Sequence, residues 1–267
     1  MIEALQYAFV QHAVIAGVLV SLAAGIIGSL IVVNRMVFLA GGIAHASYGG
    51  IGMAVFFGVP IFLGASLFAV FAALLIANLT LHKRTRIDTF IGLIWAVGMA
   101  IGVIFIDMTP GYHVDLMSYL FGSILAVSDS DLYFMGALLL LIAMSVLFWY
   151  RDILAVSYDS EYARLRGIPV RLFYTLILVL SALTVVIAIK VVGLILVIAM
   201  LTIPVYIAER LSNTLWKMMI LSGMISTLFT LTGLWLSYIY DLTSGASIIL
   251  VSAASLGLFL LLRGRRK

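Results

Sequence analysis

The feature that most limits the fold of this chain is a succession of apolar segments, each about 20 residues long. Hydrophobic residues make up 65% of the sequence and charged residues 10%, which leaves too little polar surface to cover a water-soluble globule. A helix of about 20 apolar residues crosses a hydrocarbon core of about 30 Å, whereas membrane barrels show short alternating patterns. We therefore predict an all-α, polytopic membrane helical bundle in which residues 1–267 form a single transmembrane domain.

The apolar segments predict about nine membrane spans, with eight as the alternative count. They fall near residues 8–33, 36–57, 61–80, 88–107, 131–150, 171–190, 192–208, 215–239 and 245–262. The sequence contains no cysteine, so neither a disulfide framework nor a thiolate metal site is expected.

The basic residues predict the orientation, because Lys and Arg in short loops stay preferentially on the cytoplasmic side. With the amino terminus outside and the carboxyl terminus inside, all but one of the 15 Lys and Arg lie on the cytoplasmic side, and Lys190 is the exception. An outer face rich in acids would concentrate cations. The alternative is that these acids cap helices and end solvated loops, as the positions of Asp129 and Asp131 before the fifth span indicate. The outer acids are Glu3, Asp107, Asp115, Asp129, Asp131 and Asp241.

One long polar break between spans, residues 157–169, lies on the predicted cytoplasmic side. It has acids near its start and basic residues near its end, which complement a helix dipole, and Gly167 before Ile168-Pro169 stops the helix. A polar helix between two apolar spans needs something on the cytoplasmic face to press against, which points to an energised partner. The alternative is an ordinary interfacial helix.

The outer loop, residues 108–130, is too long for a simple turn. Its stretch Val114 to Gly122 is predicted to form a short half-helix that dips back into the membrane, which is tolerated only against protein or beside a cavity. This segment is a candidate gate or docking element. His113 and Asp115 are candidates to catch a metal cation at the outer mouth, and a solvated loop pair is the alternative.

The second span surrounds one imidazole, His45, with glycine and alanine. Gly42, Ala46 and Gly49 share one helical face, and small residues let helices approach closely in lipid. An ionisable residue at this depth is a functional-site candidate, although a hydrogen-bonded packing histidine is the alternative. The residues predicted to line a translocation path are Gly41, His45, Ser47 and Tyr48.

This glycine- and alanine-rich helix with its histidine resembles the permease subunits of the zinc, manganese and iron uptake branch of ABC importers. The resemblance runs along nearly the whole chain, and the segments 87–92 and 114–127 are similar to zinc permeases in particular. The segments that carry it are Asn34-Arg35-Met36, Ala44-His45-Ala46-Ser47, Ile87 to Gly92, Val114 to Val127, Lys190-Val191-Val192-Gly193 and Leu201-Thr202-Ile203-Pro204.

The resemblance implies a homodimer of permease chains in the cell membrane of a prokaryote, two cytoplasmic ATP-binding subunits, and an extracytoplasmic protein that delivers the metal. Residues 157–169 would then be the coupling helix that seats in a groove of the ATPase. Its predicted contact residues are Tyr158, Asp159, Glu161, Arg164, Arg166 and Gly167. No phosphate-loop motif occurs in the chain, so ATP would be hydrolysed in the partner subunit. The resemblance implies neither a permanent cofactor nor a nucleic-acid partner.

The sequence departs from the family pattern at three positions that bear on the substrate. The family commonly has an Asp one turn before the helix histidine, where this chain has Gly41, and zinc permeases tend to have a His at Ala96 and an Asp at Ser123. One imidazole per chain gives at most two across a dimer axis, fewer than the ligands of an ordinary zinc site. Either the ion crosses partly hydrated, or the cargo is not a bare ion.

The predicted function is therefore the permease subunit of an ABC importer that moves a divalent metal, zinc or manganese, inward by ATP-driven alternating access. One alternative is the same scaffold importing a metal chelate or a small organic solute. Another is a stand-alone secondary carrier or channel, although no acid is predicted deep within a span to couple an ion. Catalytic signatures such as His-Glu-x-x-His and Gly-x-Ser-x-Gly are absent from the sequence, so an enzyme is not expected.

Overall fold

The structure is a computed structural model that describes residues 6–80, 87–110 and 122–264. The regular elements of this described part are helices, as predicted, and it contains no strand. They are α1 (Ala8–Val33), α2 (Val37–Phe57), α3 (Ile61–Thr80), α4 (Ile87–Asp107), the 3-10 turn η3 (Ile124–Ala126), α6 (Asp129–Phe148), α7 (Tyr150–Tyr158), α8 (Ser160–Leu165), α9 (Val170–Leu211), α10 (Leu215–Tyr240) and α11 (Ser244–Gly264).

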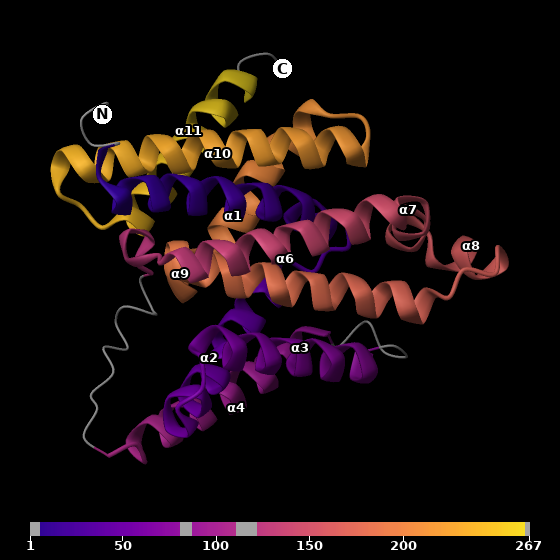
Figure 1. The fold of residues 1–267 in the computed structure, drawn as a ribbon. Helices are drawn as coiled ribbons and strands as arrows, with labels where there is room; N and C mark the ends of the chain where they lie inside the picture. Colours follow the sequence, from indigo (N-terminus) through magenta and orange to yellow (C-terminus); the bar gives the residue numbers. More distant parts are fainter. Residues whose placement is uncertain (1–5, 81–86, 111–121, 265–267) are drawn as a thin grey trace.

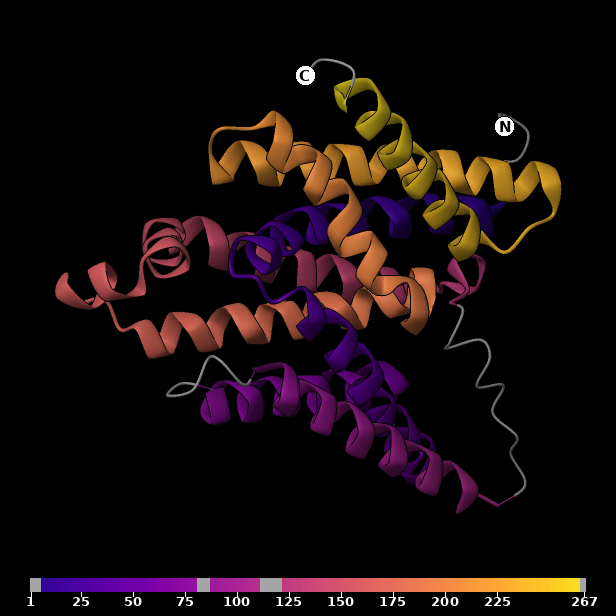
Figure 2. The same cartoon turned by 180° about the vertical axis from the view of Figure 1, so that it is seen from behind.

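Within the described residues, eight helices are long and apolar enough to cross a membrane. The two spans predicted at 171–190 and 192–208 are the two arms of one helix, α9, which is kinked at Gly193 (φ 80°, ψ 169°). This backbone conformation favours glycine, which has no Cβ to clash. The second arm turns back across the bundle (Figure 2), and the stretch of α9 counted among the eight is its first arm, Val170–Leu194.

Helix α9 holds the two parts of the bundle together. Helices α2, α3 and α4 pack against one another on one side of α9, and α1, α10 and α11 contact it as well (Figure 1). Its residues Val185, Ile187, Ala188, Val191 and Val192 are almost completely buried. A helix that is apolar around its whole circumference is expected at the centre of a bundle.

Hydroxyl groups join α1 to α10 across their interface. Ser21 and Thr230 are hydrogen bonded through their hydroxyl oxygens at 2.9 Å, and the Ser222 hydroxyl donates to the Gly25 carbonyl at 2.9 Å. A Cβ on Gly25 would lie 2.4 Å from the backbone nitrogen of Gly223. In a membrane, helices associate through close packing of small residues and through hydrogen bonds between helices.

The start of α6 and the kink of α9 lie at the same end of the bundle, opposite α7 and α8 (Figure 1). Lys190 Nζ lies 3.3 Å from Asp131 Oδ2, so the one basic residue predicted outside is neutralised by an outer acid. Asp131 also forms a capping box with Ser128 at the start of α6. The alternative interpretation of this acid as a helix cap is therefore confirmed, and the ion pair is an additional role.

Candidate functional site

Helix α2 is the most deeply buried of the eight spans, and its small residues let α4 reach backbone contact. A Cβ on Gly98 would lie 2.6 Å from the Ala46 Cα, and one on Gly52 would lie 2.3 Å from the Gly102 carbonyl oxygen. Real Cβ atoms essentially never make contacts this short, so both crossings require glycine. The close approach predicted from Gly42, Ala46 and Gly49 is confirmed, and the helix that approaches is α4.

His45 lies at the edge of this α2–α4 contact and is partly buried. Its Nδ1 is 2.8 Å from the Gly41 carbonyl oxygen. Because a carbonyl only accepts, Nδ1 must carry the hydrogen, and a neutral ring then has its lone pair on Nε2. The ring is stacked on Trp95 of α4, with centroids 4.1 Å apart and an interplanar angle of 28°. Metal-binding histidines are commonly held in this way, with one ring N–H donated to a carbonyl.

The other predicted path residues are buried inside the protomer. The Ser47 hydroxyl donates to the Ile43 carbonyl at 2.7 Å within its own helix. Tyr48 is packed against Gly102, where an added Cβ would lie 2.5 Å from the Tyr48 Cδ1. Gly41 faces α9, because a Cβ there would lie 2.4 Å from Ile198 Cδ1. Gly41 thus lies one helical turn from His45 and accepts its hydrogen bond, whereas the Ser47 and Tyr48 side chains are buried within the protomer.

The described residues contain no group of three or more His, Asp or Glu side chains that could hold a metal ion. Of the positions where zinc permeases tend to have ligands, Ala96 is exposed on α4 and Ser123 precedes η3. The outer-mouth candidates His113 and Asp115 lie outside the described residues, as does most of the predicted half-helix. Of the outer loop, residues 108–110 and 122–130 are described.

The described end of the outer loop is seated on the kink of α9. The Ser123 N–H donates to the Lys190 carbonyl at 3.2 Å. Gly122 has φ +72°, and a Cβ on it would lie 2.4 Å from the Gly193 nitrogen. Ile124 of η3 is buried and η3 packs against α1. The loop end therefore joins the kinked end of α9 to α1.

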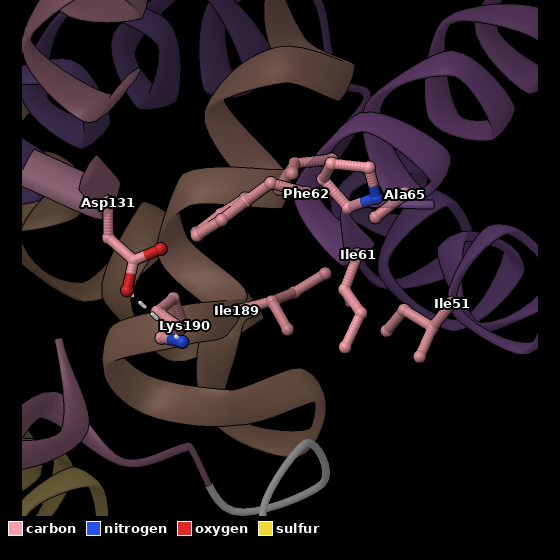
Figure 3. A pocket seen from close by; sticks show the side chains of 9 residues that line it. Ile51, Ile61, Phe62, Ala65, Asp131, Ile189 and Lys190 are labelled. Carbon is pink, nitrogen blue, oxygen red and sulfur yellow. Dashed lines mark ion pairs between the residues drawn. The ribbon is translucent and has the colours of Figure 1, made fainter. Parts of the chain in front are cut away.

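A pocket of about 240 Å³ lies between α9 and the α2–α3 pair, beside the Lys190–Asp131 ion pair (Figure 3). Ile51, Ile61 and Phe62 line it together with the Lys190 side chain. The Lys190 ammonium also lies over the Phe62 ring, 5.6 Å from its centroid. A mostly apolar pocket with an ammonium group in its wall is a poor site for a metal cation, so we do not assign the cargo to it.

The polar segment between spans contains the predicted short helix, α8. The Asp159 side chain accepts hydrogen bonds from the N–H groups of Glu161 and Tyr162, at 3.1 and 2.9 Å. At the other end, the Gly167 and Ile168 N–H groups donate to the carbonyls of Arg164 and Ala163, and Gly167 has φ +77°. These two bonds form a complete Schellman motif. The predicted stop of the helix at Gly167 is confirmed, whereas the first two residues of the predicted segment 157–169 belong to α7.

Helix α8 projects beyond the end of the bundle (Figures 1 and 2). Leu165 is 88% exposed, and Tyr158 and Tyr162 are also exposed, whereas Ala163 is buried. An open groove of about 600 Å³ runs beside these tyrosines, along α7 and the start of α10. Large apolar side chains on a polar, projecting helix are typical of a protein-binding surface.

Asn34 links this end of the bundle to the helix that carries His45, and sequence reasoning missed this role. Its side-chain amide donates to the Ser157 hydroxyl at 3.0 Å and to the Leu30 carbonyl at 2.9 Å. Asn34 lies in the turn between α1 and α2, and Ser157 lies in α7 just before α8. The Asn34–Ser157 hydrogen bond therefore connects the end of α7, next to α8, with the turn that leads into α2.

The buried α2, the kinked α9 and the projecting α8 define a multi-pass membrane transport protein of the permease class. The sequence profile of the ABC 3 transport family matches residues 6–263, and the chain belongs to this family. It is accordingly a transport subunit and not an enzyme, and ATP hydrolysis resides in a separate subunit of such transporters.

The relatives extend along almost the whole chain. An uncharacterized membrane protein of Synechocystis sp. is 46% identical over 253 residues, covering 95% of this chain and 90% of the relative. The manganese transport system membrane protein MntC of Halalkalibacterium halodurans is 35% identical, covering 94% and 86%. The solved structure of PsaBC from Streptococcus pneumoniae in complex with Fab aligns with TM-score 0.87 at 31% identity, covering 97% and 94%.

Proposed function

We propose that this permease imports a bare divalent transition-metal ion, and that the ion is manganese. One support is that a relative, MntC of Halalkalibacterium halodurans, is named as a manganese transport system membrane protein. The observation that carries the proposal is the orientation of His45, whose Nδ1 is committed to the Gly41 carbonyl and whose Nε2 is left for a ligand. Manganese in a site with one imidazole completes its coordination with oxygen ligands, including water.

The sparse ligand set fits the task of transport. A preformed site with three or four protein ligands would hold a metal too firmly to release it during each cycle, and passage through a pore needs weak binding. In the proposal the ion crosses partly hydrated and contacts His45, with Gly41, Ser47 and Tyr48 shaping the surrounding helix. Zinc, which prefers a closed tetrahedral set of ligands, is the less suitable cargo.

The proposed path lies between two copies of the chain, where the partly exposed His45 and Trp95 and the exposed Phe38 form one surface of α2 and α4. A second permease chain covering this surface would bring two imidazoles together. On the cytoplasmic side, two ATP-binding subunits receive α8 in a groove, contacting Tyr158, Glu161, Arg164 and neighbouring residues. An extracytoplasmic metal-binding protein delivers the ion, and the assembly resides in the inner or plasma membrane of a prokaryote.

The experiment compares two variants at His45 in the transporter reconstituted with its ATPase and binding protein. His45→Ala removes both the ring and the nitrogen ligand, whereas His45→Phe keeps a ring that stacks on Trp95 and removes only the nitrogens. ATP hydrolysis is measured with the binding protein loaded with Mn²⁺, loaded with Zn²⁺ or empty. We expect Mn²⁺ to stimulate the wild type most, and both variants to lose the stimulation.

The His45→Phe variant decides between the two roles of this histidine. If it melts at the wild-type temperature but loses metal-dependent ATP hydrolysis, His45 acts as a ligand. Wild-type stimulation in His45→Phe would show that the ring serves only packing and would contradict the proposed path. Equal stimulation by empty and loaded binding protein would contradict metal as the cargo.

A further inference from the structure

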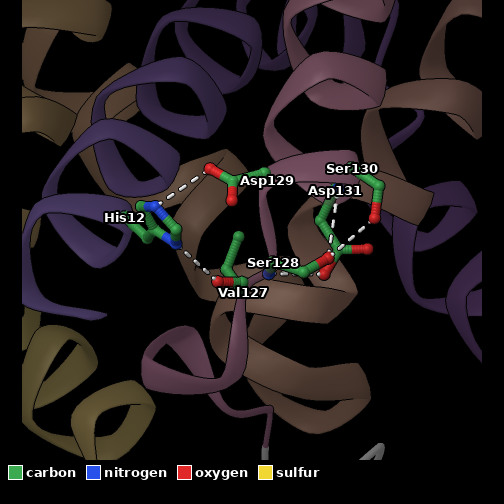
Figure 4. A network of polar contacts seen from close by, with 6 residues as sticks. All are labelled: His12, Val127, Ser128, Asp129, Ser130 and Asp131. Carbon is green, nitrogen blue, oxygen red and sulfur yellow. Dashed lines mark hydrogen bonds and ion pairs between the residues drawn. The ribbon is translucent and has the colours of Figure 1, made fainter. Parts of the chain in front are cut away.

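The described part of the chain has one place where an imidazole meets a carboxylate, and it lies at the predicted outer end of the bundle. His12 of α1 and Asp129, the first residue of α6, approach to 3.1 Å between Nε2 and Oδ1 (Figure 4). Neither residue belongs to the path that contains His45. Among the described residues, this pair of an imidazole and a carboxylate lies on α1 and α6. Gly41, the position where the family commonly has an Asp, lies on α2.

The hydrogen bonds fix which nitrogen of His12 is available. Nδ1 lies 3.1 Å from the Val127 carbonyl oxygen, and a carbonyl only accepts, so Nδ1 carries a hydrogen. In the neutral ring, Nε2 then presents a lone pair to the Asp129 carboxylate. Two electron-rich atoms 3.1 Å apart repel each other unless a positive charge lies between or beside them. That charge is either a second proton on the ring or a bound cation.

From this geometry we propose that His12 and Asp129 form an outer binding site for the cargo, a divalent transition-metal ion. Metal bonds to nitrogen and oxygen of about 2.0 to 2.2 Å, the lengths found for zinc, place two ligand atoms about 2.8 to 3.6 Å apart when the angle at the metal lies between octahedral and tetrahedral. The observed separation falls in this range. The Nδ1–H donated to Val127 is the outer hydrogen bond that orients a metal-binding histidine.

The surroundings suit a site that captures an ion and releases it again. The His12 side chain is 23% exposed, whereas the Asp129 side chain is 80% exposed to the outer water. Lys190, the basic residue on this side, is engaged by Asp131 and does not neutralise Asp129. With two protein ligands, the remaining coordination positions belong to water, so binding is weak and reversible. The proposal rests on the proposed function, because it assumes that the cargo is a divalent metal.

The first experiment counts bound Mn²⁺ by the loss of the electron paramagnetic resonance signal of aqueous Mn²⁺. It uses the permease–ATPase complex in lipid nanodiscs without binding protein, and a His45→Ala background removes the contact within the membrane. We expect His12→Gln and Asp129→Asn each to weaken Mn²⁺ binding at least about tenfold. Loss of a residue that merely hydrogen-bonds to a metal ligand already lowers metal affinity about tenfold or more, and loss of a ligand should cost at least as much.

The matched control is Asp241→Asn, which removes the same charge at the same predicted end. Asp241 has φ +52°, a left-handed conformation that Asn adopts readily. We expect this variant to bind Mn²⁺ like its parent. Unchanged Mn²⁺ binding in His12→Gln and Asp129→Asn would show that the two side chains are held together by a proton, as an ordinary ion pair. An equal loss of binding in Asp241→Asn would show that the effect is one of general surface charge. Either result overturns the site.

A second experiment uses the wild-type complex, so it does not depend on the folding of variants. Fe²⁺ bound in place of Mn²⁺, with ascorbate and hydrogen peroxide, oxidises side chains at its own binding site, and mass spectrometry locates the damage. We expect oxidation at His12 that excess Mn²⁺ suppresses, and no oxidation at His12 would overturn the proposal. Neither experiment requires transport, so a failed site and a failed import function give different results.

Discussion

The contact between α2 and α4 provides the most direct test of the way His45 is positioned. We predict that Gly98→Ala separates these two helices. The new Cβ would lie 2.6 Å from the Ala46 Cα and 2.8 Å from its carbonyl oxygen, and ordinary van der Waals contact begins at 3.4 Å. The helices must therefore move apart locally by about 0.8 Å, because the obstructing atoms are backbone and cannot rotate away.

The magnitude follows from two opposing effects. Overpacking of this kind costs about 3 kcal/mol, at the upper end of the usual range, because the collision is with backbone. Alanine is the better helix former by about 1 kcal/mol. The free energy of unfolding should therefore fall by about 2 kcal/mol. The same separation moves Trp95 away from the His45 ring, so metal-stimulated ATP hydrolysis should fall too.

The control for this prediction is Gly92→Ala on the same helix. Nothing lies within 4 Å of a Cβ at Gly92, so this variant should gain up to about 1 kcal/mol from helix propensity alone. The assay is thermal or denaturant unfolding of the purified permease in detergent, followed by ATP hydrolysis of the reconstituted complex. Equal stability of the two variants would refute the argument that backbone contact between α2 and α4 holds the site.

Two further predictions concern the cytoplasmic end. Reversing both charges of α8, with Glu161→Lys and Arg164→Glu, should leave the melting temperature of the permease unchanged while the ATPase no longer co-purifies with it; undiminished co-purification would count against the docking role. Asn34→Ala should cost about 1 to 3 kcal/mol of stability for the loss of its two side-chain hydrogen bonds and uncouple ATP hydrolysis from metal delivery. Adding Ser157→Ala should then cause no further loss, and an additive loss in this double-mutant cycle would show that the two residues act separately.

Much of the fold could be predicted because its signals are local in the sequence. Apolar length predicts the spans. The orientation drawn from the distribution of Lys and Arg stays a prediction. The end of α8 was predictable for the same reason, since Gly167 acts on the backbone within a few residues. Gly193 was a harder case: the backbone there is non-helical and the chain changes direction, so the two predicted spans are the two arms of the kinked element α9.

The composition of the site was less predictable because it depends on which residues meet across the bundle. Successive helical residues are rotated by about 100°, so Ser47, two residues after His45, lies on the opposite face of α2. Tyr48, three residues after His45, is buried against α4. The contacts of His12 with Asp129 and of Asn34 with Ser157 join segments far apart in the sequence. In a single sequence, no local pattern marks such pairs.

The measurement that tests the central claim most directly is uptake of radioactive manganese into proteoliposomes. The complete transporter, with ATPase and loaded binding protein, should accumulate Mn²⁺ only when ATP is supplied on the side of α8, and not with a non-hydrolysable analogue. Uptake at the same rate by the permease chain alone, without nucleotide or partner proteins, would contradict the account.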